Sequence, residues 1–238
     1  MNTTNSTSLL LEPGEQKEHV HPESVILQFP VDEVMLTGDL QIPRDAYGLV
    51  LFAHGSGSSR RSPRNRAVAD IFHRDGLGTL LLDLLDHEEE IDDAYSGHLR
   101  FNIGLLSRRL AVITREIVAD IRSQGLRMGY FGASTGGAAA LRAAAVSGST
   151  IGAVVSRGGR PDLGGEALEH VRAPTLLIVG EHDGEVLRLN QDAFEKLHCQ
   201  KSLAIVPHAT HLFSEPGTLE EVARLAAAWF RKHLGARG

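Results

Sequence analysis

The sequence predicts an α/β fold whose mostly parallel, doubly wound sheet has about eight strands and is flanked by helices. Three observations support this prediction. Strand-like segments alternate with helical segments from about residue 23 to the end of the chain, an order typical of parallel sheets with right-handed crossovers. Several of the strand-like segments are continuously apolar, as expected of strands covered on both faces. The 238 residues suffice for one domain with a sizeable core.

Each element follows from its local pattern. Residues 1–22 are polar and predict a loosely ordered N-terminal arm, whereas residues 23–238 form the predicted domain. Segments 25–29 and 34–41 predict an opening hairpin. Six further strands are predicted at residues 49–53, 79–82, 127–131, 151–155, 174–179 and 202–206. Helices are predicted to begin at Ser62-Pro63 and to cover residues 101–124, 137–145, 187–197 and 218–233.

Composition limits the functional classes. The net charge of −6 gives no electrostatic case for nucleic-acid binding. No apolar run has the length of a membrane span, and residues 9–11 lack the basic flank of a signal peptide. Cys199 is the only cysteine, so no internal disulfide can form, which fits a reducing compartment. We therefore expect a cytoplasmic monomer or homodimer without nucleic-acid or membrane partners.

The segment Gly132-Ala133-Ser134-Thr135-Gly136 matches the pattern G-x-S-x-G, in which a serine sits on a sharp turn between a strand and a helix. Such a turn exposes the serine hydroxyl, and the helix N-terminus offers free backbone N–H groups beside it. Side chains at the two outer glycines would clash where the strand meets the helix. We predict Ser134 as a nucleophile; the alternative is a turn that needs small residues only for packing.

A serine nucleophile needs a base and an acid, and both follow predicted strands. Ligands of open α/β sheets bind at the carboxyl ends of the strands, and Asp183 and His211 each lie just beyond such an end. His211 would take the proton of Ser134, and Asp183 would orient the imidazole and stabilise its charged form. The competing assignments are Asp162 for the acid and His182 and His208 for the base.

The loop His54-Gly55-Ser56-Gly57-Ser58-Ser59 follows the predicted strand 49–53. Its glycines would let backbone N–H groups approach a substrate carbonyl, so we predict an oxyanion hole formed by the N–H groups of Ser56 and Thr135. The alternative is a phosphate-cradling loop, but the segment lacks both the Gly-Lys-Ser/Thr ending of a P-loop and the spacing of a dinucleotide-binding loop.

Other charged segments are less specific. Arg157 and Arg160 follow a predicted strand, and either could contact an acidic substrate group or tie down a loop by an ion pair. Four arginines near the 54–59 loop are interpreted as a solvated basic face, and the acidic run 86–93 as a solvated loop without metal spacing. The four arginines are Arg60, Arg61, Arg64 and Arg66.

From about residue 23 onward the chain resembles the α/β-hydrolase superfamily, and within it the dienelactone hydrolase-type branch without a cap domain. The resemblance rests on the segments His54-Gly55-Ser56-Gly57-Ser58, Gly132-Ala133-Ser134-Thr135-Gly136, Glu181-His182-Asp183 and His208-Ala209-Thr210-His211. Dienelactone hydrolases use a cysteine nucleophile where this chain has Ser134, so the resemblance implies ordinary serine ester chemistry. Similar domains also occur attached to phosphoribosyltransferases.

The expected function is that of a serine carboxylesterase acting on small or accessible esters, with no cofactor and no metal. The segments after residues 83 and 155 are too short for a helical cap domain, so the site should be open. Residues expected to line it or bind substrate are His54, Leu84, Leu85, Tyr95, Arg157, Leu212 and Phe213. The alternatives are an amidase, thioesterase or acyltransferase with the same triad, or a non-catalytic binding protein.

Overall fold

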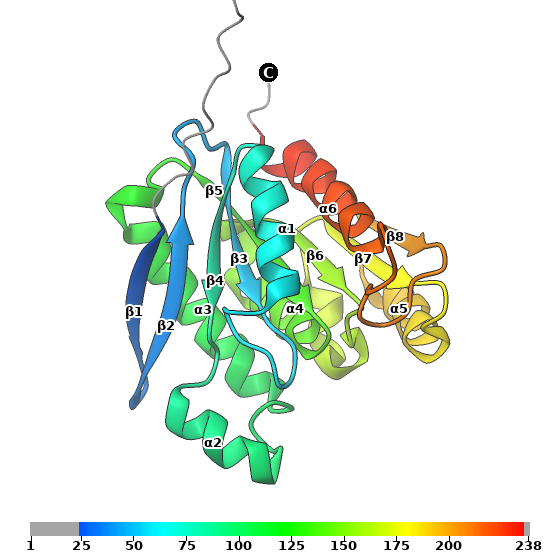
Figure 1. Ribbon diagram of the computed structural model, residues 1–238, viewed down its shortest axis with the longest axis horizontal. Coiled ribbons are helices and arrows are strands. Elements are labelled where there is room, and N and C mark those ends of the chain that lie inside the picture. Colours follow the sequence, from blue (N-terminus) through cyan, green and yellow to red (C-terminus); the bar gives the residue numbers. More distant parts are fainter. Residues whose placement is uncertain (1–23, 236–238) are drawn as a thin grey trace, which may run out of the picture.

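The computed structural model describes residues 24–235 and shows an eight-stranded, mostly parallel sheet (Figure 1). The strand order is β1-β2-β4-β3-β5-β6-β7-β8. The pairs β1–β2 and β2–β4 are antiparallel, and all other neighbours are parallel. The strands are β1 (Val25–Val31), β2 (Val34–Gln41), β3 (Gly48–Ala53), β4 (Leu77–Leu82), β5 (Arg127–Ala133), β6 (Ile151–Arg157), β7 (Thr175–Gly180) and β8 (Lys201–Val206). From β3 the chain adds β4 on one side and then β5 to β8 on the other side of the sheet. The carboxyl ends of β3 and β5, where this order switches, are therefore the expected binding position.

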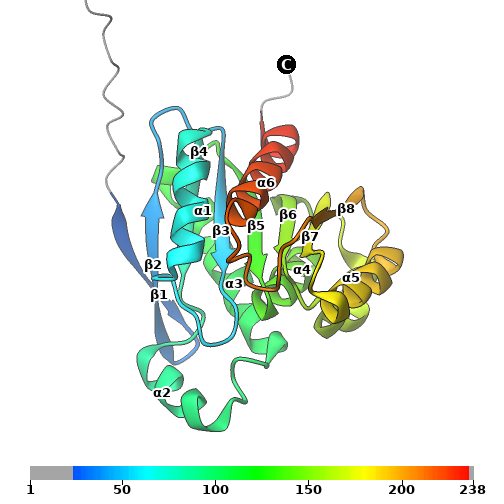
Figure 2. The same ribbon diagram turned by 45° about the vertical axis from the view of Figure 1, so that its right-hand side comes forward.

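Helices cover both faces of this sheet (Figures 1 and 2). Buried residues of α1 and α6 belong to one apolar cluster, and those of α3, α4 and α5 belong to the other. The helix α2 lies beyond the carboxyl ends of the central strands (Figure 1). The helices are α1 (Pro63–Arg74), α2 (His87–Ser96), α3 (Ile103–Ala119), α4 (Thr135–Ser147), α5 (Gly184–Lys196) and α6 (Thr218–Leu234), with 3-10 turns at Ile121–Ser123, Gly148–Thr150 and Pro161–His170.

The two faces pack with different side chains. Toward α1 and α6, the rings of Phe52, Phe72, Phe131 and Phe230 contact one another with centroids 4.9 to 5.7 Å apart. Such tilted and edge-to-face contacts add to the energy of burying the rings. Toward the other face, α4 presents mainly alanines, all buried, so its backbone can lie close to the sheet. These alanines are Ala138, Ala139, Ala140, Ala143 and Ala144.

The predicted fold class is confirmed, and the predicted elements all exist. Two predictions were wrong in detail. The helix predicted over 101–124 begins at Ile103 and ends at Ala119, because Asn102 caps its start and Asp120 is extended. The acidic run 86–93 is not a loop but the first part of α2. The predicted arm 1–22 lies outside the described residues.

The helix α2 forms because its ends are capped. Asp86 accepts a hydrogen bond from the N–H of Glu89, whose side chain accepts one from the N–H of Asp86, and Gly97 ends the helix in a left-handed conformation. Between β4 and α3 the structure contains this one helix and its flanking loops rather than a separate cap domain. None of the helices within residues 24–235 is long and apolar enough to cross a membrane.

Candidate active site

Ser134 occupies a sharp turn between the last residue of β5 and the first residue of α4. Its φ of 51° and ψ of −121° are rare for a residue with a side chain. The flanking glycines make the turn possible. A Cβ at Gly132 would lie 2.4 Å from the carbonyl oxygen of Gly136, and a Cβ at Gly136 would lie 2.1 Å from that of Ala53. The fold therefore holds the Ser134 hydroxyl out of the sheet, as the sequence pattern indicates.

The structure brings Asp183 and His211 together. Nδ1 of His211 lies 2.6 Å from Oδ2 of Asp183. Asp183 is the N-cap residue of α5, yet its side chain makes no capping bond, so the carboxylate serves the histidine instead. If Nδ1 carries the proton and Nδ1–H donates a hydrogen bond to the carboxylate, Nε2 keeps a free lone pair, which is the state a general base needs.

The loops that carry the acid and the histidine are fixed to each other by backbone contacts. The N–H of His182 donates to the carbonyl of Ala209 at 2.9 Å, and that of Glu181 donates to Val206 at 3.0 Å. A Cβ at Gly180 would lie 2.3 Å from the Ala209 oxygen, so only glycine permits this approach. The separation of the carboxylate and the imidazole is therefore set by the backbone frame.

Ser134 and His211 line the same hollow, which has a volume of about 210 Å³. No hydrogen bond joins their side chains among the described residues. In proteins without bound substrate such bonds are often long and shorten only in the complex. Of the three residues predicted as nucleophile, base and acid, His211 thus contacts Asp183 and shares a hollow with Ser134.

The predicted oxyanion-hole residues lie next to the elbow. Thr135 is the first residue of α4, so its backbone N–H has no partner within the helix. The side-chain oxygens of Ser56 and Thr135 lie 3.1 Å apart, which brings the 54–59 loop against the helix N-terminus. A Cβ at Gly55 would lie 3.0 Å from Cβ of Ser134. The 54–59 loop and the N-terminus of α4 therefore meet beside Ser134.

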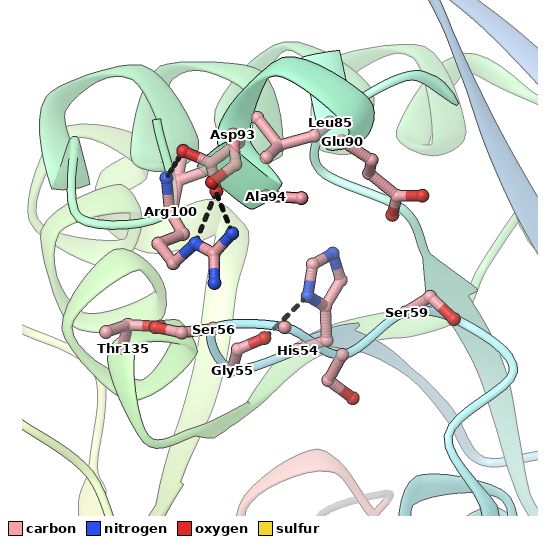
Figure 3. Close-up of a pocket in the computed structure, with 13 residues that line it drawn as sticks. His54, Gly55, Ser56, Ser59, Leu85, Glu90, Asp93, Ala94, Arg100 and Thr135 are labelled. Carbon is pink, nitrogen blue, oxygen red and sulfur yellow. Dashed lines mark hydrogen bonds and ion pairs between the residues drawn. The ribbon is translucent and has the colours of Figure 1, made fainter. Parts of the chain in front are cut away.

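A second, larger hollow of about 420 Å³ lies on the other side of the 54–59 loop, toward α2 (Figure 3). We call it the α2-side hollow, and the one that holds Ser134 the α1-side hollow. Gly55, Ser56 and Ser58 line both. The α2-side hollow is also lined by His54, Leu85, Glu90, Asp93, Arg100 and Thr135, among others. The 54–59 loop thus lies between two hollows, one of which contains Ser134.

His54 lines the α2-side hollow but is held by the backbone. Its Nδ1 lies 3.0 Å from the carbonyl of Gly55, and its Nε2 accepts a hydrogen bond from the N–H of Leu84 at 3.1 Å. Burial lowers the pKa of His54, so the ring is neutral. Of the other residues expected to line the site, Leu85 lines the α2-side hollow and Leu212 the α1-side hollow, whereas Tyr95 is 91% exposed and lines neither.

The two arginines that follow β6 differ. Arg160 donates to both carboxylate oxygens of Asp162 at 2.9 and 2.8 Å. This ion pair fixes the loop and engages the carboxylate of Asp162, the alternative to Asp183 as the acid. Arg157 makes no ion pair within residues 24–235, is buried, and lines the α1-side hollow. Its guanidinium carbon lies 5.8 Å from the ring centroid of Phe213, which is buried beneath it. Burial, together with the charge of Arg64, lowers the pKa of Arg157 to about 10.

The basic segment after the loop is only partly the solvated face that the sequence predicts. Arg61 and Arg66 are exposed, but Arg60 is largely buried and pairs with Asp39 and Asp83. Arg64 lines the α1-side hollow with its Nε buried. Arg60 and Arg61 lie in the turn before α1, and the helical period places Arg64 and Arg66 on different sides of α1. The number of charges in the segment does not reveal this separation.

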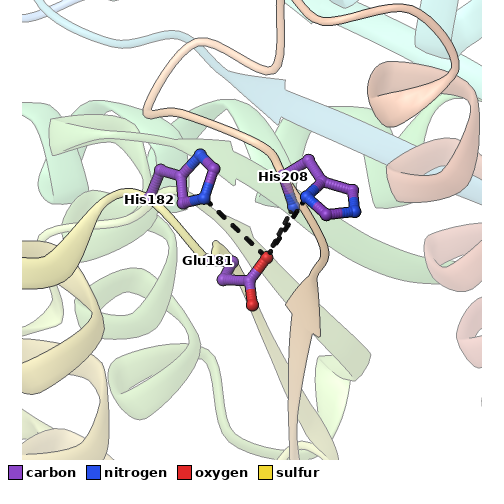
Figure 4. A group of neighbouring side chains, drawn as sticks. All are labelled: Glu181, His182 and His208. Atoms are coloured by element: carbon purple, nitrogen blue, oxygen red, sulfur yellow. Dashed lines mark hydrogen bonds and ion pairs between the residues drawn. The ribbon is translucent and has the colours of Figure 1, made fainter.

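The competing histidines form a separate surface cluster with Glu181 (Figure 4). His182 and His208 lie 4.0 and 3.8 Å from the same Glu181 oxygen, which also accepts the N–H of His208 at 2.8 Å. All three side chains are exposed, and their ligand atoms lie within 4.8 Å of one another. They are the residues most suited to hold a metal ion among those described, but they lie outside both hollows.

The helix α2 contributes to the site, which the interpretation of residues 86–93 as a solvated loop did not predict. Glu90, Asp93 and Arg100 line the α2-side hollow because α2 is a helix rather than a solvated loop. Asp93 is buried and accepts hydrogen bonds from the N–H groups of Leu99 and Arg100. The spacing of Asp86 and Glu89, typical of a capping box, could have predicted the helix.

The strand order, the serine turn after β5, the acid after β7 and the histidine after β8 define an α/β hydrolase. No protein-family model matches the chain. A solved structure of the dienelactone hydrolase from Anabaena variabilis ATCC 29413 is 55% identical, with a TM-score of 0.88 over 90% of this chain and 99% of that one. The chain therefore belongs to the dienelactone hydrolase-like branch of this superfamily.

Other matches agree with the fold. An esterase from Pyrococcus furiosus is 16% identical with a TM-score of 0.74, covering 90% of this chain and 92% of that chain. Two curated Mycobacterium tuberculosis proteins, from strains CDC 1551 / Oshkosh and ATCC 25618 / H37Rv, are each 50% identical over 212 residues and are named "Putative phosphoribosyl transferase". The match covers 89% of this chain but only 47% of those proteins, so the chain spans about half their length.

Proposed function

We propose that the protein is a serine carboxylesterase that acts on small or accessible esters. The observation that carries this proposal is the contact between His211 and Asp183 at 2.6 Å in a site where His211 shares a hollow with the half-buried Ser134. The hydroxyl alone is a weak nucleophile and needs an oriented base. No other histidine of the described part of the chain lines that hollow.

The reaction has two halves. Nε2 of His211 takes the proton of Ser134 as its oxygen attacks the ester carbonyl, and Asp183 stabilises the imidazolium. The N–H groups of Ser56 and Thr135 bind the negative oxygen of the tetrahedral intermediate, each contributing on the order of 3 kcal/mol. His211 then protonates the departing alcohol. In the second half, His211 takes a proton from water as the water oxygen attacks the acyl carbonyl. His211 then returns this proton to the departing Ser134 oxygen, and the acid is released.

Two properties of the relatives bear on this proposal. The family member from Anabaena is a dienelactone hydrolase, which supports cleavage of an ester bond. The transferase activity in the name of the Mycobacterium proteins is not assigned to this chain, because this chain matches only 47% of their length. The chain itself has the fold of a hydrolase.

The first experiment compares p-nitrophenyl acetate and butyrate hydrolysis by the wild type and by Ser134→Ala. We expect a loss of about five to six orders of magnitude in turnover, because the covalent step is removed. Circular dichroism and the unfolding midpoint check that the variant is folded. Near-normal turnover in folded Ser134→Ala would overturn the proposal.

A second experiment separates an esterase from related acyl-transfer enzymes and from a binding protein. Matched ester, thioester and amide substrates are compared by kcat/KM, and the ester is expected to be the best. A fluorophosphonate reagent should label Ser134 in the wild type but not in Ser134→Ala. A folded wild type that neither turns over esters nor reacts with the reagent would favour a non-catalytic role.

A further inference from the structure

We infer that the α1-side hollow contains a subsite for a phosphate group on the substrate, formed by Arg157 and Arg64. This inference rests on the proposed function, because it places the subsite beside the nucleophile. The hollow is lined by both arginines together with Ser134 and His211. A group bound by the arginines therefore lies in the same hollow as the serine.

The first argument is the state of the Arg157 side chain. Its Nε and Nη1 are buried and have no hydrogen-bond partner. Burying a guanidinium without a partner is costly, and its pKa of about 10 leaves it charged at neutral pH. The charged group that acts on Arg157 is Arg64, and no carboxylate of the described residues compensates the two positive charges. Arg157 is thus a buried cation without an acidic partner among the described residues.

The second argument comes from Arg64 and its neighbour. Nε of Arg64 is also buried without a partner, and Arg64 belongs to no ion pair in the described residues. Asn65 lines the same hollow, and Ser58 and Ser62 add hydroxyl groups. Two guanidinium groups and neutral hydrogen-bonding groups surround the space, with no acidic side chain among the residues that line it.

The number of charges favours a phosphate over a carboxylate. A phosphate monoester carries about −1.5 to −2 charges at neutral pH and three acceptor oxygens, so one group can neutralise both arginines. A carboxylate carries one negative charge and would leave one arginine uncompensated. Phe213 lies against the guanidinium of Arg157, which limits the orientations of that donor group and favours a fixed geometry.

Binding is tested without catalysis. Isothermal titration at constant ionic strength measures phenyl phosphate and benzoate binding to the wild type and to Ser134→Ala. We expect both proteins to bind phenyl phosphate, and to bind benzoate at least about tenfold more weakly, the factor that corresponds to one charge-assisted hydrogen bond. Because Ser134→Ala is included, this result does not depend on whether the protein hydrolyses esters.

Variants locate the subsite. Arg157→Met and Arg64→Met should each weaken phenyl phosphate binding at least about tenfold, and Arg157→Lys should restore part of the affinity. The matched control is Arg61→Met, which removes the same charge from an exposed position in the same segment and should change affinity less than about twofold. Unfolding midpoints confirm that each variant is folded.

Kinetics then connect the subsite to the substrate. The acetate ester of 2-hydroxyethyl phosphate should have a higher kcat/KM than that of 2-methoxyethanol, and Arg157→Met should reduce this ratio through KM. Unchanged phosphate binding in both arginine variants would overturn the inference, as would the absence of binding to folded wild type. Tighter binding of benzoate than of phenyl phosphate would overturn the assignment to phosphate. If anions bind as expected but no ester is cleaved, the proposed function fails while the subsite stands.

Discussion

The two sides of the 54–59 loop differ in how their charges are compensated. On the α2 side, Arg100 pairs with Asp93, and Arg109 donates to both carboxylate oxygens of Glu89 at 2.6 and 2.7 Å. On the α1 side, Arg157 has no acidic partner. Arg109 and Arg157 are almost equally buried, with 3% and 7% exposed, so burial does not explain the difference.

The difference separates two uses of a buried arginine. Arg109 also donates to the carbonyl of Leu84 at 2.8 Å, so it joins α3, α2 and the segment after β4. Its charge is satisfied within the protein and serves the structure. The charge of Arg157 is retained against the cost of burial and lies beside Ser134, which is the arrangement expected of a residue that binds a ligand.

The largest effect expected in this comparison concerns stability. Arg109→Met should reduce the free energy of unfolding by about 3 kcal/mol, because it leaves the partly buried Glu89 without its partner. Arg157→Met should change it by less than about 1 kcal/mol or increase it, because no partner is stranded and an uncompensated charge is removed. Urea denaturation measures both.

Equal losses of unfolding free energy in Arg109→Met and Arg157→Met would contradict the difference between the two arginines. A large loss in Arg157→Met alone would mean that this arginine serves the structure, against the inference of a subsite. The exposed Arg61 again supplies the control, since its replacement by methionine should change stability by less than about 0.5 kcal/mol.

A smaller effect concerns the pH dependence of stability. Burial places the pKa of His54 below its ordinary value of 6.5. As the pH falls below that value, the unfolded chain takes up a proton on this histidine and the folded protein does not. The stability that His54 confers is therefore full above about pH 6.5 and decreases toward lower pH, at a rate approaching about 1.4 kcal/mol per pH unit.

His54→Gln should lack this part of the pH dependence, because glutamine can accept the N–H of Leu84 and does not titrate. Urea denaturation of both proteins at about pH 7.5 and about pH 5.5 tests it. The pKa of His233 is also lowered by burial and nearby cations, and the difference between the two proteins removes its contribution. Identical losses of stability on acidification would contradict the assignment to His54.

The sequence was sufficient for the framework of the site and insufficient for its lining. The spacing of glycines around Ser134 and the strand-end positions of Asp183 and His211 follow from local patterns, and the structure brings these residues to one place. Arg160 finds its carboxylate two residues along the chain, at Asp162. Whether Arg157 finds a carboxylate depends on side chains from other elements, and no local pattern encodes that.

The smallest effect tests whether the two sides of the loop act independently. Asp86→Ala removes the side-chain bond to the N–H of Glu89 and should cost about 1 kcal/mol. Hydrogen exchange should then accelerate in α2, whose residues line the α2-side hollow. Asp92→Ala, at an exposed position of the same helix, is the control. Because α2 does not line the α1-side hollow, the affinity of Asp86→Ala for phenyl phosphate should remain within about twofold of that of the wild type. A parallel loss of that affinity would show that the two hollows are coupled through the 54–59 loop.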